Sequence, residues 1–196
     1  MGAAVTALKR SQLGLGPWDV LNDGIARHSP LDLGLIGILS GLPILVFWWP
    51  LRQRPGVGTV ANVLLIGFVV HRLLPHTSPA TDWPTRTGLL ILGLVTFALG
   101  QGLYLGAGLG AGPRDGLMTG LNARLGWSIR AARTFLESTA LVGGALLGGS
   151  IGVGTIVFAL GIGPMVQVTM RWFGYPFDSQ ALVGHRAAEA IGLAGD

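Results

Sequence analysis

The sequence contains no cysteine and few charged residues. Only 11% of its 196 residues are Asp, Glu, Lys or Arg, whereas soluble chains carry about 25%. The lack of cysteine excludes disulfides, thiol catalysis and a cysteine-ligated zinc site. The low charge, together with a hydrophobic content of 50%, excludes an ordinary soluble domain and indicates a membrane protein.

The formal net charge is +4, but the basic residues form no patch interleaved with aromatic side chains. They stand at the ends of apolar runs, as the positive-inside rule describes for membrane proteins. We therefore expect the lipid bilayer to surround the chain, and we expect no nucleic-acid partner.

Two motifs occur twice, at the same offset of 96 residues. Residues 13–21 (LGLGPWDVL) return as residues 109–117 (LGAGPRDGL), and residues 56–59 (GVGT) return as residues 152–155. Because the offset is equal, the two halves align without a gap, which indicates a tandem duplication. The repeated structural residues are Gly16 and Pro17 with Gly112 and Pro113, and Gly58 and Thr59 with Gly154 and Thr155.

Apolar runs follow these motifs along the chain. Five of them, with their flanks, approach the roughly 20 residues that a helix needs to cross a bilayer; they are residues 33–49, 57–70, 88–110, 129–148 and 153–172. Residues 1–12 align with the second part of the third run, so we interpret them as a truncated first helix. Either the true start lies upstream or this helix is a degenerate stub. Trp48 and Trp49 end the first run, and we expect them in the headgroup region.

Each Gly-Pro motif precedes a short stretch, residues 19–29 and 115–125, that is half the length of a span. Proline suits the first helical position, and an aspartate two residues later lies near the positive end of the helix dipole. We therefore predict two short half-helices, either re-entrant or on the membrane surface.

Three crossings per repeat bring the second half into the membrane from the opposite side. The predicted fold is an all-α polytopic bundle of two inverted repeats, with five full crossings, a truncated first helix and two half-helices. Residues 1–75 form the first repeat, 76–87 a polar loop, 88–172 the second repeat and 173–196 a tail. The excess of basic residues is greatest when Arg52 and Arg54 are cytoplasmic, and this also places the C-terminus in the cytoplasm.

The candidate solute or ion site comprises Asp19, Arg114, Asp115, Arg133, Glu137 and Asn62. Two half-helix N-termini near the midplane would suit an anionic group, or the two aspartates would take a proton or a cation. First-turn capping without any ligand explains both aspartates equally well. Glu137 is expected to pair with Arg133, four residues before it on the same helix face, or with Arg114; the pair is either structural or part of a transport site. Asn62 is either an interhelical hydrogen-bonding group or a cavity residue.

No nucleophile–base pair, metal cluster or phosphate-binding loop stands out, so we expect neither an enzyme nor a cofactor or metal. Inverted repeats with half-helices recur in secondary transporters, and the first hypothesis is a transporter-like protein for a small solute. The second is a membrane scaffold or regulatory partner protein whose spans pack against another protein. The oligomeric state stays open.

The motifs G-x-G-P-W-D and G-A-G-P-R-D-G-L-M, each followed by G-V-G-T, resemble those of the bacterial YczE/YyaS/YitT family of integral membrane proteins. The resemblance covers residue 13 to about residue 171, and the chain departs from the family pattern in its short first helix. It implies a multi-pass protein of the bacterial cytoplasmic membrane, and it implies no established activity.

Overall fold

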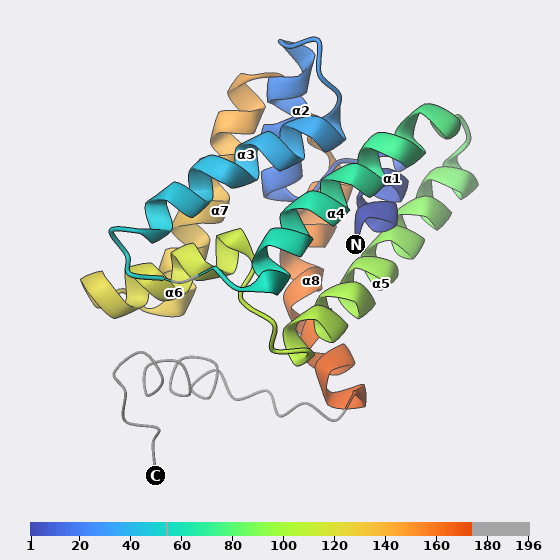
Figure 1. Ribbon diagram of the computed structural model, residues 1–196. Coiled ribbons are helices and arrows are strands. Elements are labelled where there is room, and N and C mark those ends of the chain that lie inside the picture. Colours follow the sequence, from blue (N-terminus) through green and yellow to red (C-terminus); the bar gives the residue numbers. More distant parts are fainter. Residues whose placement is uncertain (54, 174–196) are drawn as a thin grey trace.

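The computed structural model describes residues 1–53 and 55–173. In this part of the chain all regular secondary structure is helical, and there is no strand (Figure 1). Its helices are α1 Gly2–Ser11, α2 Pro17–Arg27, α3 Leu33–Trp48, α4 Val57–Leu73, the 3₁₀ turn η1 Leu74–His76, α5 Trp83–Gly106, α6 Pro113–Leu125, α7 Ile129–Leu146 and α8 Val153–Trp172. The predicted all-α class is confirmed.

Three segments of the described chain are long and apolar enough to cross a membrane: Val57–His76, Trp83–Gly106 and Val153–Trp172. Helix α3 is apolar but has only 16 residues. Helix α7 has 18 residues but carries three charged side chains, Arg130, Arg133 and Glu137. The helical membrane class is therefore supported, while the five crossings and their inverted arrangement remain predictions.

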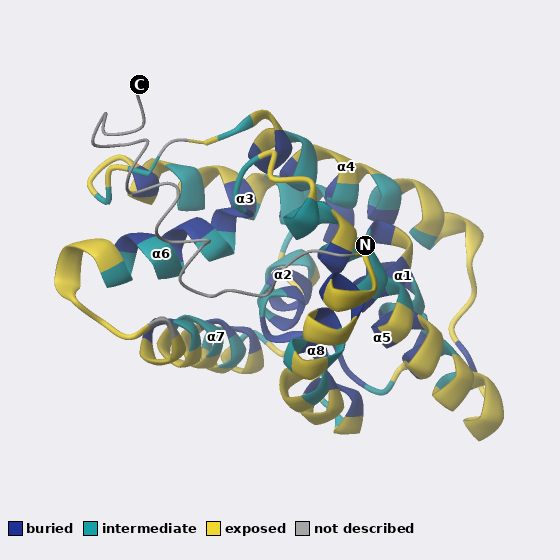
Figure 2. Ribbon diagram, turned by 90° about the horizontal axis from the view of Figure 1, so that it is seen from below, coloured by how far each residue is buried: buried dark blue, intermediate teal, exposed yellow. Residues whose placement is uncertain are grey.

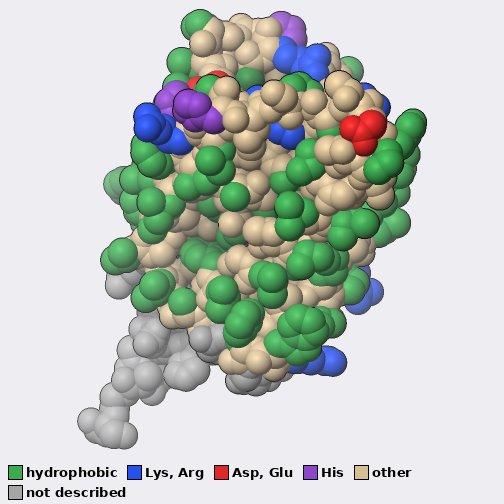
Figure 3. All heavy atoms as spheres, turned by 90° about the vertical axis from the view of Figure 1, so that its right-hand side faces the viewer, with side chains coloured by type: hydrophobic (Ala, Val, Ile, Leu, Met, Phe, Trp, Pro, Cys, Tyr) green, Lys and Arg blue, Asp and Glu red, His purple; other side chains and the backbone are tan. Residues whose placement is uncertain are grey.

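The outer faces of the long helices are strongly apolar. Leu65 of α4 is 60% exposed and Leu160 of α8 is 75% exposed, whereas buried residues face the neighbouring helices (Figure 2). Figure 3 shows hydrophobic side chains spread over most of one face, with charged side chains near its top and its lower edge. A surface of this kind suits contact with lipid, in which backbone polar groups must be satisfied within helices.

The two short helices, α2 and α6, begin as their motifs predict. Gly16 and Gly112 are the N-caps, proline follows in both, and Asp19 and Asp115 lie in the first turn. Both helices pack between α3 and α7. Each short helix therefore contacts a longer helix from the other half of the chain. Their position, re-entrant or on the membrane surface, stays a prediction.

Reciprocal backbone contacts join the two halves. The amide of Gly58, at the start of α4, donates to the carbonyl of Leu109 at 2.9 Å, and the amide of Gly154, at the start of α8, donates to the carbonyl of Leu13 at 2.7 Å. We call these equivalent contacts the crossed clasps. In each of them a GVGT segment binds the LGxGP loop of the opposite half, so the two motifs recur together because they contact each other.

Glycine is required in the loops of the crossed clasps. Gly14 and Gly110 have φ of 116° and 127°, a region that is nearly restricted to glycine. A Cβ at Gly14 would lie 2.5 Å from the hydroxyl oxygen of Thr155, and one at Gly110 would lie 2.9 Å from that of Thr59. The loops therefore approach the opposite helix too closely for a side chain.

The main hydrophobic core lies where α1, α5 and α8 meet. Leu8 of α1 is 1% exposed, and the rings of Phe97 (α5) and Phe158 (α8) meet edge to face at 5.1 Å. Helix α1, Gly2–Ser11, packs on α4 and α5, so this short helix lies largely inside the bundle.

The expectation that both Trp48 and Trp49 lie in the headgroup region is wrong for Trp48. Trp49 is 87% exposed, but Trp48 is 2% exposed and its indole nitrogen donates to the carbonyl of Pro113 at 2.9 Å. Its ring also contacts Gly116, where a side chain would collide with it. Because α6 offers a glycine at this position, Trp48 joins α3 to α6 instead of facing lipid.

Candidate functional site

A cavity of about 130 Å³ lies between helices from both halves of the chain. A single water molecule needs a cavity volume of about 10–15 Å³, so this cavity has room for a small solute of several heavy atoms. Its polar lining comes from α2, α3, α4, α5 and α6 and comprises Asp19, Asn22, Ser40, Asn62, Gln101, Tyr104, Arg114 and Asp115.

A second cavity of about 80 Å³ lies toward α7 and α8 and is lined in part by Arg133, Glu137 and Phe158. Some residues line both cavities and form a common wall: Trp18, Phe97, Gln101, Arg114 and Asp115. The six predicted candidates, from α2, α4, α6 and α7, all line one or both cavities. The structure therefore brings together residues that are up to 118 positions apart in the sequence, Asp19 and Glu137.

An ion pair crosses between the halves at this wall. A guanidinium nitrogen of Arg114 lies 3.7 Å from a carboxylate oxygen of Asp19, and the centre of the guanidinium lies 5.1 Å from the centre of the Trp18 ring. Asp19 is 7% exposed. In the repeat, Trp18 corresponds to Arg114 and Asp19 corresponds to Asp115. The contact thus joins equivalent helix starts through side chains that differ between the halves.

Asp115 differs from Asp19 in its charged contacts. In the described part of the chain, residues 1–53 and 55–173, no ion pair includes Asp115. Asp115 nevertheless lines both cavities, as Arg114 does. Of the two carboxylates at the helix starts, that of Asp19 is therefore the one paired with the guanidinium of Arg114.

Arg133 and Glu137 form the predicted pair on α7. The Arg133 Nε atom donates to Glu137 Oε1 at 2.9 Å, and both side chains line the smaller cavity. The geometry is that of a full charge-assisted hydrogen bond. This pair therefore forms one polar wall of the smaller cavity.

We expect Glu137→Gln to lower the free energy of unfolding by about 1.5–3 kcal/mol, the value of a hydrogen bond to a charged group, because Arg133 loses its carboxylate. The matched control changes both residues, Arg133→Met with Glu137→Leu, and should cost less than the single substitution because no charge is stranded. Unfolding by sodium dodecyl sulfate in mixed micelles, followed by circular dichroism, measures both. Equal stability of Glu137→Gln and the unmodified protein would show that the pair has no structural role.

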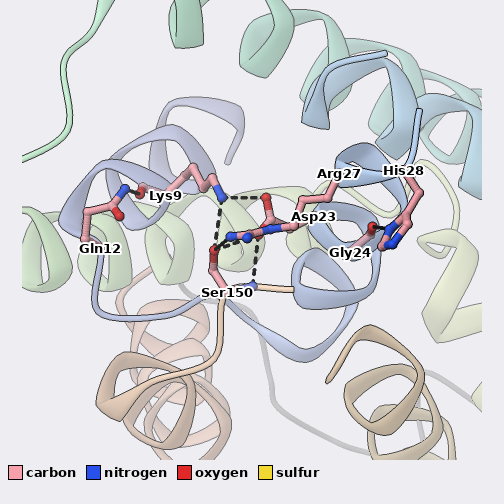
Figure 4. Close-up of polar contacts among 7 residues, drawn as sticks. All are labelled: Lys9, Gln12, Asp23, Gly24, Arg27, His28 and Ser150. Atoms are coloured by element: carbon pink, nitrogen blue, oxygen red, sulfur yellow. Dashed lines mark hydrogen bonds and ion pairs between the residues drawn. The ribbon is translucent and has the colours of Figure 1, made fainter. Parts of the chain in front are cut away.

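A polar cluster that the sequence did not predict joins α1 and α2 to the loop before α8 (Figure 4). Lys9 Nζ lies 2.5 Å from one carboxylate oxygen of Asp23. The amide and the hydroxyl of Ser150 donate to the other at 2.9 and 2.6 Å, and Arg27 lies 3.5 Å from it. The local signals are that Asp23 precedes Arg27 by four residues, which allows the two to pair on one helix face, and that it follows Asp19 by four residues. Its partners Lys9 and Ser150 are too distant in sequence to be inferred.

Asp32 and His71 form a second pair that sequence analysis missed. Asp32 caps α3 by accepting hydrogen bonds from the amides of Gly34 and Leu35 at 2.8 and 3.1 Å, and it contacts His71 Nδ1 at the end of α4. Partial burial raises the pKa of the Asp32 carboxyl, but the hydrogen bonds from His71 and the two amides outweigh it and hold the pKa below its usual value. The carboxylate thus fixes the relative positions of α3 and α4.

The fold and these cavities define a helical membrane protein with a charged interior site between two related halves. The chain belongs to the family described as "Family of unknown function (DUF6198)", whose model matches residues 1–171. An "Uncharacterized protein" of Haemophilus influenzae is 39% identical over 157 residues, which are 80% of this chain and 72% of that protein. The "Uncharacterized membrane protein YczE" of Bacillus subtilis is 34% identical over 176 residues, which are 86% of this chain and 79% of that protein. The resemblance to YczE-type proteins is therefore confirmed. No solved structure matches the chain.

Proposed function

We propose that this protein is a transporter-like membrane protein that binds a small solute in the two cavities between its halves. The observation that carries the proposal is the meeting of Asp19, which lines the larger cavity, with Arg114 and Asp115 of the wall shared by both cavities, at the starts of two repeat-related short helices. Secondary transporters bind their solutes in this way, between repeats and at interrupted helices near the bilayer midplane.

The proposed arrangement is two inverted repeats in the bacterial cytoplasmic membrane. The crossed clasps support it, because each half provides the same contacts to the other. Basic residues support a cytoplasmic position for the segment around Arg52 and for the C-terminal tail, although residues 174–196 lie outside the part of the chain that the structure describes. We propose no catalytic activity, since the chemistry of the cavity residues suits binding.

Cysteine labelling tests the proposal directly, because the chain has no native cysteine. We expect cysteines at Asn62 and Gln101, both in the lining of the larger cavity, to react with a membrane-impermeant methanethiosulfonate reagent. Water in the cavity permits the thiolate that reacts. Cysteine at Leu65, which is 60% exposed on α4, should not react because it faces hydrocarbon.

The competing hypothesis, a scaffold or regulatory partner protein, predicts a closed bundle. In that case neither cavity cysteine reacts from either side of sealed vesicles, and the proposed function is wrong. Reaction of both cavity cysteines, with no reaction at Leu65, supports solute access.

A further inference from the structure

The wall between the cavities already holds a positively charged group, the guanidinium of Arg114. It lies within the roughly 6 Å of an aromatic ring that a cation–π contact requires, and it faces the Asp19 carboxylate at 3.7 Å. That separation exceeds the 2.7–3.2 Å of a hydrogen bond and exceeds the 2.9 Å of the Arg133–Glu137 pair. The Trp18 ring and the Asp19 carboxylate therefore form a cation site with a loosely held occupant.

Two further carboxylates, those of Asp115 and Glu137, line the smaller cavity together with Arg114. A guanidinium that leaves Asp19 therefore remains near negative charge. Three carboxylates line the two cavities beside two guanidiniums and the Met1 amino group, so the charges of the lining balance. The preference for a cation therefore rests on the Trp18 ring and the Asp19 carboxylate and not on the total charge of the lining.

The repeat explains why this site is incomplete. Trp18 and Arg114 are equivalent positions, as are Asp19 and Asp115. The Asp19–Arg114 pair has no counterpart at Asp115, because the position that would provide its guanidinium holds Trp18. One half therefore provides the cation and the other the aromatic surface on which a cation rests.

From this geometry we infer that the solute is a small organic cation with one ammonium or guanidinium group, which takes the place of the Arg114 guanidinium between Trp18 and Asp19. The inference rests on the proposed function and names the solute class for the same cavities. Displaced Arg114 then pairs with Asp115. The side chain of Arg114 acts as a tethered competitor of the solute.

Binding of methylguanidinium and methylammonium chloride to the protein in lipid nanodiscs tests this inference, by calorimetry at constant ionic strength, with acetate and glycine as the anionic and zwitterionic probes. We expect the two cations to bind and acetate not to bind. Arg114→Gln should tighten methylguanidinium binding about tenfold if Arg114 occupies the site about 90% of the time. Asp19→Asn should weaken it at least tenfold.

Two further variants keep the test informative. Trp18→Leu should weaken methylguanidinium binding several-fold through loss of the ring, even if Arg114→Gln does not fold. Asp82→Asn, at an exposed helix cap of α5, is the matched carboxylate control and should leave binding unchanged. Circular dichroism and gel filtration establish that each variant is folded.

Several outcomes would overturn the inference and leave the proposed function standing. One is that acetate binds and Arg114→Gln abolishes its binding, which would identify an anion site. Another is that glycine binds more tightly than either cation, as it would if the Met1 amino group, on the wall of the larger cavity, paired with the carboxylate of glycine. A third is that no probe binds although the cavity cysteines react. Unreactive cavity cysteines would instead contradict the proposed function.

Discussion

Alanine at Gly110 is expected to destabilise the folded protein by about 2–6 kcal/mol. The backbone there has φ of 127°, and holding a residue with a side chain in such a region costs about 1–3 kcal/mol. The added Cβ would also lie 2.9 Å from the Thr59 hydroxyl and 3.0 Å from the Cα of Gly56, and crowding of this kind costs a further 1–3 kcal/mol or so. Gly14→Ala should behave in the same way at the other clasp.

Gly88→Ala is the matched control. Gly88 lies in α5, and a Cβ there meets nothing within 4 Å. Alanine favours a helix over glycine by up to about 1 kcal/mol, so the control should be as stable as the unmodified protein or slightly more so. Unfolding by sodium dodecyl sulfate in mixed micelles compares the three variants. If Gly110→Ala is as stable as Gly88→Ala, the crossed clasps do not hold the halves together.

Asp23→Asn is expected to cost about 3–5 kcal/mol, the range for a buried ion pair that loses one member. The Asp23 side chain is 5% exposed and that of Lys9 is 17% exposed, so the ammonium would be left without its carboxylate away from bulk water. The substitution also weakens two hydrogen bonds from Ser150. Contacts that hold α1 and α2 to the loop before α8 would be lost together, and thermal unfolding should begin at a clearly lower temperature.

Asp82→Asn serves as the control for this substitution as well. Asp82 is an exposed N-cap that accepts a hydrogen bond from the Thr85 amide at 2.9 Å, and asparagine caps helices about as well as aspartate. Its effect on stability should be a few tenths of a kcal/mol. A similar small effect at Asp23 would show that Lys9 finds another partner and that the cluster in Figure 4 is not structural.

The features that could be predicted from the sequence depend on near neighbours in the chain. Gly16-Pro17 and Gly112-Pro113 begin short helices because a proline at the first helical position and an acidic first turn act over three or four residues. The Arg133–Glu137 pair follows from one helical turn. The length of the apolar runs and the low charge also indicate a membrane protein, because run length and composition can be read without knowing the fold.

The sequence predicts which residues form the candidate site, but it does not predict which of them pair with each other. Asp19, Arg114 and Asp115 drew attention as charged residues at repeated motifs, yet the pairing of Arg114 with Asp19 and Trp18 depends on how α2 and α6 approach each other. The Lys9–Asp23–Ser150 cluster depends in the same way on three segments distant in the chain. Side-chain contacts between distant segments depend on tertiary packing, which no local pattern encodes.

The sequence by itself determined the helical class, the duplication and the starts of the short helices, because hydrophobicity, an equal offset and capping chemistry are local or additive properties. Only the tertiary structure decided how the halves interlock. Trp48 of α3 packs on Gly116 of α6, while at the equivalent contact Gly144 of α7 meets the backbone of Val20 in α2. In the first contact the larger side chain belongs to the long helix and the glycine to the short one, and in the second contact the glycine belongs to the long helix. Such complementarity is a property of two surfaces in contact, and it appears only when both helices are in place.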